Sequence, residues 1–321
     1  MSALEIADVV LPVFAVIVTG WGAGALGLVS RALADGLIHF AYNFAMPALL
    51  FVTVAEEPAR ALLEWRFVAA FGGGSLICFA LVFALARRRF GPGLARPTMY
   101  GIAAAMTNTG FVALPILAAV YGQRAVLPAA IATLFVAVVM FPAAVIALEI
   151  DGRGARSEAM RPGVLARHIA LNPMVFSTLL GVAWSILGVR LPGPLAAYLN
   201  IFAGALTPCA LFAIGLGLSV GGLRATLGPS VALTAIKLVV MPLIVYGLAL
   251  VGGLDPLATV AAVICAAVPT AKTVYILAGE YACEETMVAS TVSMTTLFSV
   301  LSLLVWLYAL SGLSARISAG P

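Results

Sequence analysis

The chain has 321 residues, of which 63% are hydrophobic and only 9% are charged, and its mean hydropathy is +1.15. An average soluble domain contains roughly 25% charged residues, so this composition excludes a soluble globular protein. The net charge of +4 comes largely from arginines in loops, without a basic cluster that contains aromatic residues, which argues against a nucleic-acid partner.

Uncharged windows recur along the whole chain, and many reach the roughly 20 residues that cross a bilayer. With the polar segments between them taken as loops, the sequence predicts ten membrane-spanning helices at residues 8–29, 35–55, 67–86, 98–121, 125–148, 169–189, 195–220, 227–251, 256–279 and 286–312. The N-terminal segment carries Glu5 and Asp8 and no basic region, so it does not look like a cleavable signal peptide. We therefore expect an all-α integral membrane protein that keeps its first helix.

The arginines predict how the chain lies in the membrane. If the N-terminus is outside, ten arginines fall on the cytoplasmic side and five on the opposite side. The positive-inside rule then places both termini outside. We expect the bacterial inner membrane as the location.

The longest polar stretch lies at the middle of the chain. We predict a first five-helix repeat over residues 1–150, a central cytoplasmic loop over 151–168 and a second five-helix repeat over 169–321. Five spans in each half give the two halves opposite orientations. The halves also share local sequence, because PALLF (47–51) is similar to PCALF (208–212) and ALPILAAVY (113–121) to AVPTAKTVY (267–275). Inverted repeats of this kind are typical of secondary carriers.

Pro115 and Pro269 lie near the middle of the fourth and ninth predicted spans. Proline removes an amide donor and clashes with the preceding turn, so we predict that both helices break there. Broken backbone inside a membrane needs protein or a water-filled cavity around it, and half-helices that begin at the prolines would direct positive dipole ends into that cavity. The alternative is that both prolines only kink their helices, as we expect of Pro12, Pro128, Pro142, Pro173 and Pro242.

The predicted substrate site consists of polar and small residues near both breaks: Asn108, Thr109, Gly110, Pro115, Pro269, Thr270, Lys272, Thr273, Asn43 and Thr207. Lys272 lies near the predicted membrane centre, where a lysine costs about 2.5 to 3.5 kcal/mol, so it needs a partner. That partner is the substrate anion or, in a structural role, backbone carbonyls. Asn43 and Thr207 line the cavity or pack between helices, and Lys237 faces the cavity or extends its side chain to an interface.

No residue pattern indicates an enzyme or a cofactor. The four cysteines lack metal-like spacing, and the chain has no HExxH motif, no intramembrane aspartate pair and no Ser/His arrangement. We therefore expect no cofactor, no metal and no catalysis. A multispan membrane sensor or a channel is the alternative to a carrier.

Three segments resemble the auxin efflux carrier family of the bile acid/auxin-carrier superfamily: NFAMPALLF (43–51), NTGFVALPIL (108–117) and VPTAKTVYILAGEY (268–281). The resemblance extends over the whole chain through the number of spans, the central loop and the order of motifs. It implies two inverted five-helix repeats, divided into a scaffold and a transport domain, whose fourth and ninth helices cross at their prolines. Asn108, Pro115 and Pro269 match the family's crossover positions, so the resemblance implies a substrate role for them.

The resemblance further implies a secondary transporter of a small organic anion, a carboxylate, a dicarboxylate or an auxin-like molecule, that works by alternating access. Its partners are then the anion and membrane lipids, with a homodimer as the candidate oligomer. Two positions depart from the family, because bacterial members often carry Asn where Thr273 stands and Lys272 is not expected. One interpretation is that the Lys272 ammonium stands where sodium sits in bile-acid symporters. The coupling ion, a proton or sodium, stays open.

Overall fold

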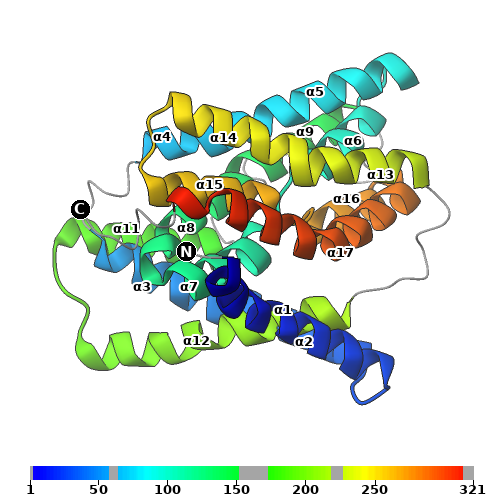
Figure 1. Ribbon diagram of the computed structural model, residues 1–321. Helices are drawn as coiled ribbons and strands as arrows, with labels where there is room; N and C mark the ends of the chain where they lie inside the picture. Colours follow the sequence, from blue (N-terminus) through cyan, green and yellow to red (C-terminus); the bar gives the residue numbers. More distant parts are fainter. Residues whose placement is uncertain (1–2, 58–63, 152–172, 218–226, 314–321) are drawn as a thin grey trace.

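The computed structural model describes residues 3–57, 64–151, 173–217 and 227–313, and Figure 1 shows their arrangement. The regular elements of the described residues are all helices, which confirms the predicted all-α class. In chain order they are α1 (Ala3–Ala25), α2 (Arg31–Phe40), η1 (Ala41–Ala45), α3 (Met46–Glu56), α4 (Trp65–Phe67), η3 (Val68–Gly72), α5 (Gly73–Phe90), α6 (Ala95–Ala105), η4 (Thr109–Ala113), α7 (Leu114–Tyr121), η5 (Gln123–Ala125), α8 (Val126–Phe135), η6 (Val136–Met140), α9 (Phe141–Ile150), α11 (Pro173–Leu187), α12 (Gly193–Leu216), α13 (Leu227–Ala235), η7 (Ile236–Val240), α14 (Met241–Val251), α15 (Pro256–Ala267), α16 (Lys272–Glu280) and α17 (Glu285–Ala309).

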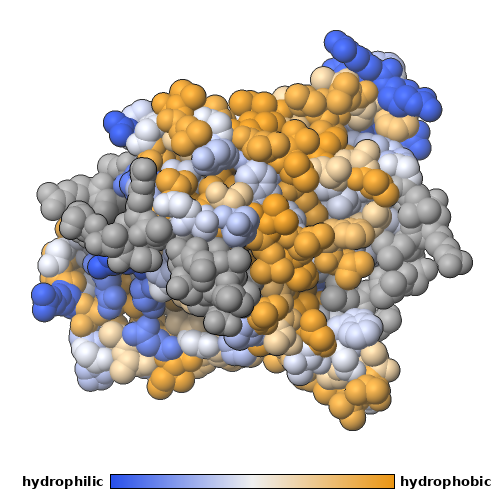
Figure 2. Space-filling view, in the orientation of Figure 1, coloured by the Kyte–Doolittle hydropathy of each residue, from blue (hydrophilic) through white to orange (hydrophobic). Residues whose placement is uncertain are grey.

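Several of these elements join end to end into helices that can cross a bilayer. Six are long and apolar enough to do so: Ala32–Glu56, Trp65–Phe90, Gln123–Ile150, Gly193–Leu216, Gly228–Val251 and Glu285–Ala309. Figure 2 shows a broad hydrophobic surface across the middle of the molecule, with the most hydrophilic residues towards its ends. The protein is an integral membrane protein. The count of ten spans and the inverted repeat stay predictions, and the predicted central loop lies outside the described residues except for Asp151.

Prolines in the middle of helices are accommodated by local widening. Among the described residues, the π-helical segments η1, η4, η6 and η7 each end two residues before a proline, namely Pro47, Pro115, Pro142 and Pro242. A proline clashes with the carbonyl group four residues earlier, and a π-helical turn relieves this clash by widening the hydrogen-bonded ring. The chain therefore continues as a helix through these prolines.

The two interrupted helices break at positions that differ in their relation to proline. The ninth predicted span breaks between α15 and α16, at residues 268–271, and Pro269 lies in this break as predicted. The fourth breaks between α6 and η4, at residues 106–108. The predicted break at Pro115 is therefore wrong, because the preceding π-helical turn lets the helix run from Thr109 to Tyr121.

The helices form two packed groups. The first group consists of α1, α2, η1, α3, α11 and α12, which pack mainly against one another and occupy the lower part of Figure 1. The second group contains the two broken helices α6–η4–α7 and α15–α16 together with α5, α8, α9, α13, α14 and α17. Contacts of α12 with η4, of α1 with α7 and of α3 with α8 join the two groups. The broken helix α6–η4–α7 therefore faces the first group.

Side-chain contacts join the ends of three segments of the second group. Arg96 at the start of α6 pairs with Glu284, which precedes α17, and the Tyr281 hydroxyl donates a hydrogen bond of 2.7 Å to Glu149 of α9. Burial and the bond to Glu149 raise the pKa of Tyr281. These ends lie on one side of the molecule, as the predicted alternation of spans requires.

Helices α1 and α12 approach so closely that only glycine fits at the contact. A Cβ atom at Gly215 would lie 2.0 Å from the Ile17 carbonyl oxygen, and one at Gly20 would lie 2.2 Å from that of Phe212. Small residues allow such close backbone approach in membranes. We expect Gly215→Ala to lower the melting temperature clearly, whereas Gly204→Ala on the same helix, where a Cβ meets nothing within 4 Å, leaves it unchanged. Equal melting temperatures of the two purified variants would contradict this packing.

Candidate functional site

The two helix breaks lie against each other. Thr107 and Thr270 form an antiparallel β-bridge, in which the Asn108 N–H donates to the Pro269 carbonyl at 2.9 Å and the Ala271 N–H donates to the Met106 carbonyl at 3.0 Å. Backbone groups released by one break are thus paired by the other, which solves the problem of unpaired backbone inside a membrane. The predicted crossing of the fourth and ninth segments is present, with residues 106–108 in the place expected for Pro115.

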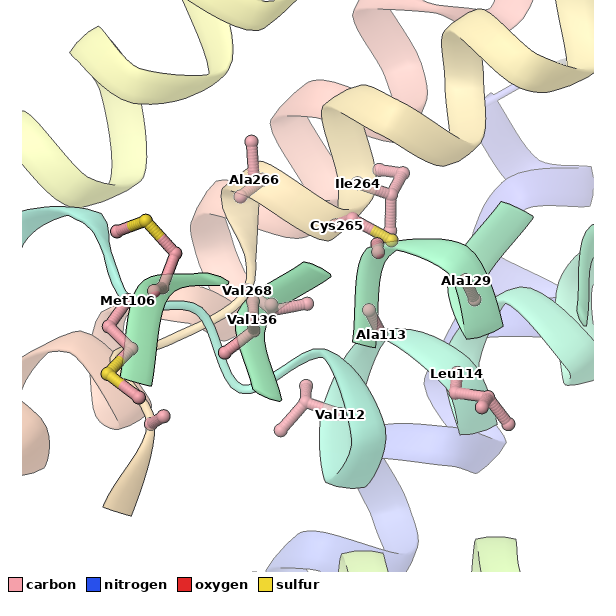
Figure 3. Packing of buried hydrophobic residues seen from close by; sticks show 14 of the residues in the cluster. Met106, Val112, Ala113, Leu114, Ala129, Val136, Ile264, Cys265, Ala266 and Val268 are labelled. Carbon is pink, nitrogen blue, oxygen red and sulfur yellow. The ribbon is translucent and has the colours of Figure 1, made fainter. Parts of the chain in front are cut away.

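Thr270 fixes this crossing to two neighbouring helices. Its hydroxyl group donates to the Ala103 carbonyl at 2.6 Å, and its N–H donates to the Thr295 hydroxyl of α17 at 3.2 Å. Figure 3 shows the apolar packing around the crossing, where Met106 and Val268 of the two breaks lie near Val112 and Val136. The crossing is therefore held by both hydrogen bonds and close apolar contacts.

A cavity of about 170 Å³ lies beside the crossing; we call it the crossover cavity. Its lining comes from both breaks and from both helix groups: Tyr42, Met106, Thr107, Asn108, Thr109, Gly110, Phe111, Thr133, Val136, Ala137, Phe141, Met174, Ala271 and Thr273. Pockets for drug-sized ligands are larger, roughly 300 to 1,000 Å³, so this cavity suits a molecule of only a few heavy atoms.

The N-terminal ends of two half-helices meet at the crossover cavity. Helix η4 begins at Thr109 and α16 begins at Lys272, and both first turns contribute lining residues, Thr109, Gly110 and Phe111 from η4 and Thr273 from α16. The first N–H groups of a helix have no partner within the helix, and the helix dipole is positive at that end. The crossover cavity therefore receives N–H donors and positive potential from two directions.

The lining mixes apolar side chains with six polar ones that carry no charge: Tyr42, Thr107, Asn108, Thr109, Thr133 and Thr273. Asn108 precedes η4 without making a capping hydrogen bond to it, so its amide group is free to interact with a ligand. The Thr107 hydroxyl is buried and has no hydrogen-bond partner. The Thr133 hydroxyl donates to the Ala129 carbonyl at 2.8 Å. None of the lining residues in the described part of the chain is acidic or basic, so none of these side chains repels an anion by charge.

The predicted site residues divide into those that line the crossover cavity and those that do not. Asn108, Thr109, Gly110 and Thr273 line it. Pro269 and Thr270 belong to the bridge beside it, and Pro115 lies further along α7. The cavity also contains Tyr42, Thr107 and Thr133, which sequence reasoning missed, although Thr107 directly precedes the motif that begins at Asn108.

Asn43 and Thr207 lie elsewhere. The Asn43 amide donates to the His39 carbonyl of its own helix at 2.9 Å. Thr207 lines a separate cavity of about 340 Å³ between α3, α7 and α12, together with Gln123 and Asn200. Neither residue lines the crossover cavity.

The ammonium groups of the two lysines lie near the C-terminal ends of neighbouring helices. A Cβ atom at Gly217, which follows α12, would lie 2.9 Å from Lys272 Nζ, and the Asp35 carboxylate of α2 acts electrostatically on this ammonium. Lys272 does not line the crossover cavity. Lys237 is completely buried and donates a hydrogen bond to the Ala266 carbonyl at the end of α15. The alternative that Lys237 extends to an interface is therefore wrong.

Comparison with known proteins shows the family of the chain. The Membrane transport protein family matches residues 6–307. The chain is 31% identical over 305 residues to the Putative malonate transporter of Rhizobium meliloti (strain 1021), covering 95% of each chain. It is 25% identical over 308 residues to an Uncharacterized transporter of Methanothermobacter thermautotrophicus, covering 93% of this chain and 96% of the relative. It is also 26% identical over 260 residues to the mouse Lysosomal cholesterol signaling protein, covering 76% of this chain and 30% of the relative. The chain therefore belongs to the membrane transport protein family, the auxin efflux carrier family that its motifs resemble.

Proposed function

We propose that the protein is a secondary transporter of a small carboxylate or dicarboxylate, which binds in the crossover cavity. The observation that carries this proposal is the meeting of two half-helix N-termini at a small cavity whose apolar lining includes several uncharged polar residues. Helix N-termini bind carboxylates through their free N–H groups and their positive dipole ends. The same arrangement would repel a cation.

Malonate is the substrate that the name of one relative suggests for a first test. The Rhizobium meliloti relative carries malonate in its printed name and matches the chain over nearly its whole length. A three-carbon dicarboxylate suits a cavity of about 170 Å³. Two carboxylates on such a short molecule also suit two helix N-termini that approach from different directions.

We propose alternating access between the two helix groups as the mechanism. Tyr42 of η1 and Met174 of α11 belong to the first group, whereas the rest of the cavity lining belongs to the second. The first group then acts as the scaffold and the second as the transport domain, and relative motion opens the cavity to either side of the membrane. In this proposal the two halves of the chain form inverted five-helix repeats in the bacterial inner membrane, with both termini outside.

Uptake by purified protein in lipid vesicles tests the function. We expect saturable uptake of radiolabelled malonate that is accelerated by unlabelled malonate inside the vesicles, because exchange across one alternating site shows this counterflow. Flux that rises linearly with concentration and shows no counterflow would indicate a channel. Absence of flux together with specific binding would indicate a sensor.

Thr107 gives a prediction in which stability and binding change in opposite directions. Burying a hydroxyl without a partner costs roughly 1–3 kcal/mol, so Thr107→Val is expected to raise the melting temperature. The same change alters a residue that lines the crossover cavity and is expected to weaken malonate binding about tenfold, as measured by titration calorimetry.

Thr53→Val is the matched control for Thr107→Val. Thr53 also has a buried hydroxyl without a partner, but it lies on α3 and does not line the crossover cavity. We expect this variant to gain stability while its affinity for malonate stays unchanged. Equal affinities of the Thr107 and Thr53 variants would remove Thr107 from the site.

A further inference from the structure

Lys237 is a completely buried lysine in the membrane-spanning part of the protein. Its side chain has no exposed surface, and its ammonium group donates a hydrogen bond to the carbonyl oxygen of Ala266. Within the described residues, no carboxylate forms a salt bridge with it. A lysine is costly at such a position, so its charge needs another source of stabilisation.

That stabilisation comes from the C-terminal end of a half-helix. Helix α15 ends at Ala267, immediately before the break that contains Pro269. The last carbonyl groups of a helix have no partner within it, and the helix dipole is negative at that end. The Lys237 ammonium therefore lies against the negative end of α15, beside the crossing.

The other broken helix ends differently. At the C-terminal end of α6, the Ala103 carbonyl accepts from the Thr270 hydroxyl at 2.6 Å and the Ala104 carbonyl accepts from the Cys78 thiol at 3.7 Å. These donors are neutral. The crossing thus contains two negative helix ends, and among the described residues only the end of α15 accepts a hydrogen bond from a lysine.

Helix ends of this kind have a recurrent role in secondary transporters, because the carbonyl groups at the C-terminal ends of half-helices and in unwound segments coordinate the coupling cation. We propose that the Lys237 ammonium is a built-in cation that fills such a position at the end of α15, so that the crossover cavity binds its anion without sodium. The positive charge of Lys237 also makes the electrostatic potential at the crossing more positive than neutral donors, like those at the end of α6, would make it. The sequence suggested that the Lys272 ammonium takes the place of sodium. We assign this role to Lys237 instead.

Cation-dependent thermal stability of the purified protein tests this proposal without any substrate. The wild-type protein is expected to melt within about 1 °C of the same temperature in sodium, potassium and choline chloride of equal ionic strength, because its cation position is filled. Lys237→Ala opens the position. This variant is expected to melt at a lower temperature in choline chloride and to gain at least about 3 °C from sodium or ethylammonium chloride.

Lys237→Met is the matched control, because it removes the charge but keeps a long apolar side chain in the space. Its melting temperature is expected to be the same in all four salts. A wild-type protein that is stabilised by sodium relative to choline would overturn the proposal. So would a folded Lys237→Ala variant that responds equally to all salts. If the alanine variant fails to fold, the melting temperatures of the wild-type protein in sodium chloride and in choline chloride still test the proposal.

The built-in cation matters for transport only if the protein is a transporter, so this proposal rests on the proposed function. Different experiments would reject the two proposals. Absence of malonate uptake would reject the substrate and leave the cation measurement unaffected. Malonate uptake that requires sodium would support the transporter and reject the built-in cation.

Discussion

Replacement of Gly110 by leucine is expected to reduce malonate uptake to background. A Cβ atom at Gly110 would lie 3.1 Å from the Met46 sulfur and 3.4 Å from the Thr133 methyl group, so a larger side chain has to extend into the crossover cavity. A cavity of about 170 Å³ cannot hold both a leucine side chain and a dicarboxylate. Uptake of radiolabelled malonate into proteoliposomes measures the effect.

Two further variants separate a blocked cavity from a damaged fold. Gly110→Ala adds one carbon near the flexible end of Met46 and is expected to retain part of the uptake. Gly279→Leu on α16 adds the same bulk as Gly110→Leu where a Cβ meets nothing within 4 Å, and is expected to transport normally. Normal uptake by a correctly folded Gly110→Leu variant would place the substrate outside the crossover cavity.

Replacement of Asn108 by leucine is expected to weaken malonate binding by roughly 10- to 100-fold. The Asn108 amide lines the crossover cavity and makes no capping bond, so it is available to donate to a carboxylate. A hydrogen bond to a charged group contributes about 1.5–3 kcal/mol, and each 1.4 kcal/mol changes affinity tenfold. Leucine keeps the size of asparagine but removes the donor, and titration calorimetry reports the change in dissociation constant.

Asn200→Leu provides the comparison for Asn108→Leu. Asn200 lines the separate cavity of about 340 Å³ near Thr207, so its loss is expected to leave malonate affinity unchanged. If the Asn200 variant lost affinity and the Asn108 variant kept it, the separate cavity would be the binding site.

The helical class and the existence of two breaks could be predicted from the sequence, but the position of one break could not. Long uncharged windows identify membrane helices directly because the bilayer sets their length. Pro115 was a weaker guide, since a π-helical turn before a proline keeps the helix continuous. The motif NTGF that begins at Asn108 nevertheless marked the correct segment, because these residues start the half-helix and line the cavity.

The roles of the two lysines could not be predicted because they depend on which way each helix is rotated. Both lysines lie in predicted spans, and the sequence favours Lys272 as a site residue because it is close to Pro269. In the structure Lys272 extends towards the end of α12, whereas Lys237 is buried at the end of α15. Thr133 and Tyr42 were missed for a similar reason, since tertiary packing alone brings them to the cavity.

A structure of the protein with malonate bound tests the central claim most directly. We expect a carboxylate of malonate in the crossover cavity, within hydrogen-bonding distance of the N–H groups of Thr109 and Gly110 at the start of η4. Malonate bound in the cavity that contains Thr207, with none at the crossing of the two broken helices, would contradict it.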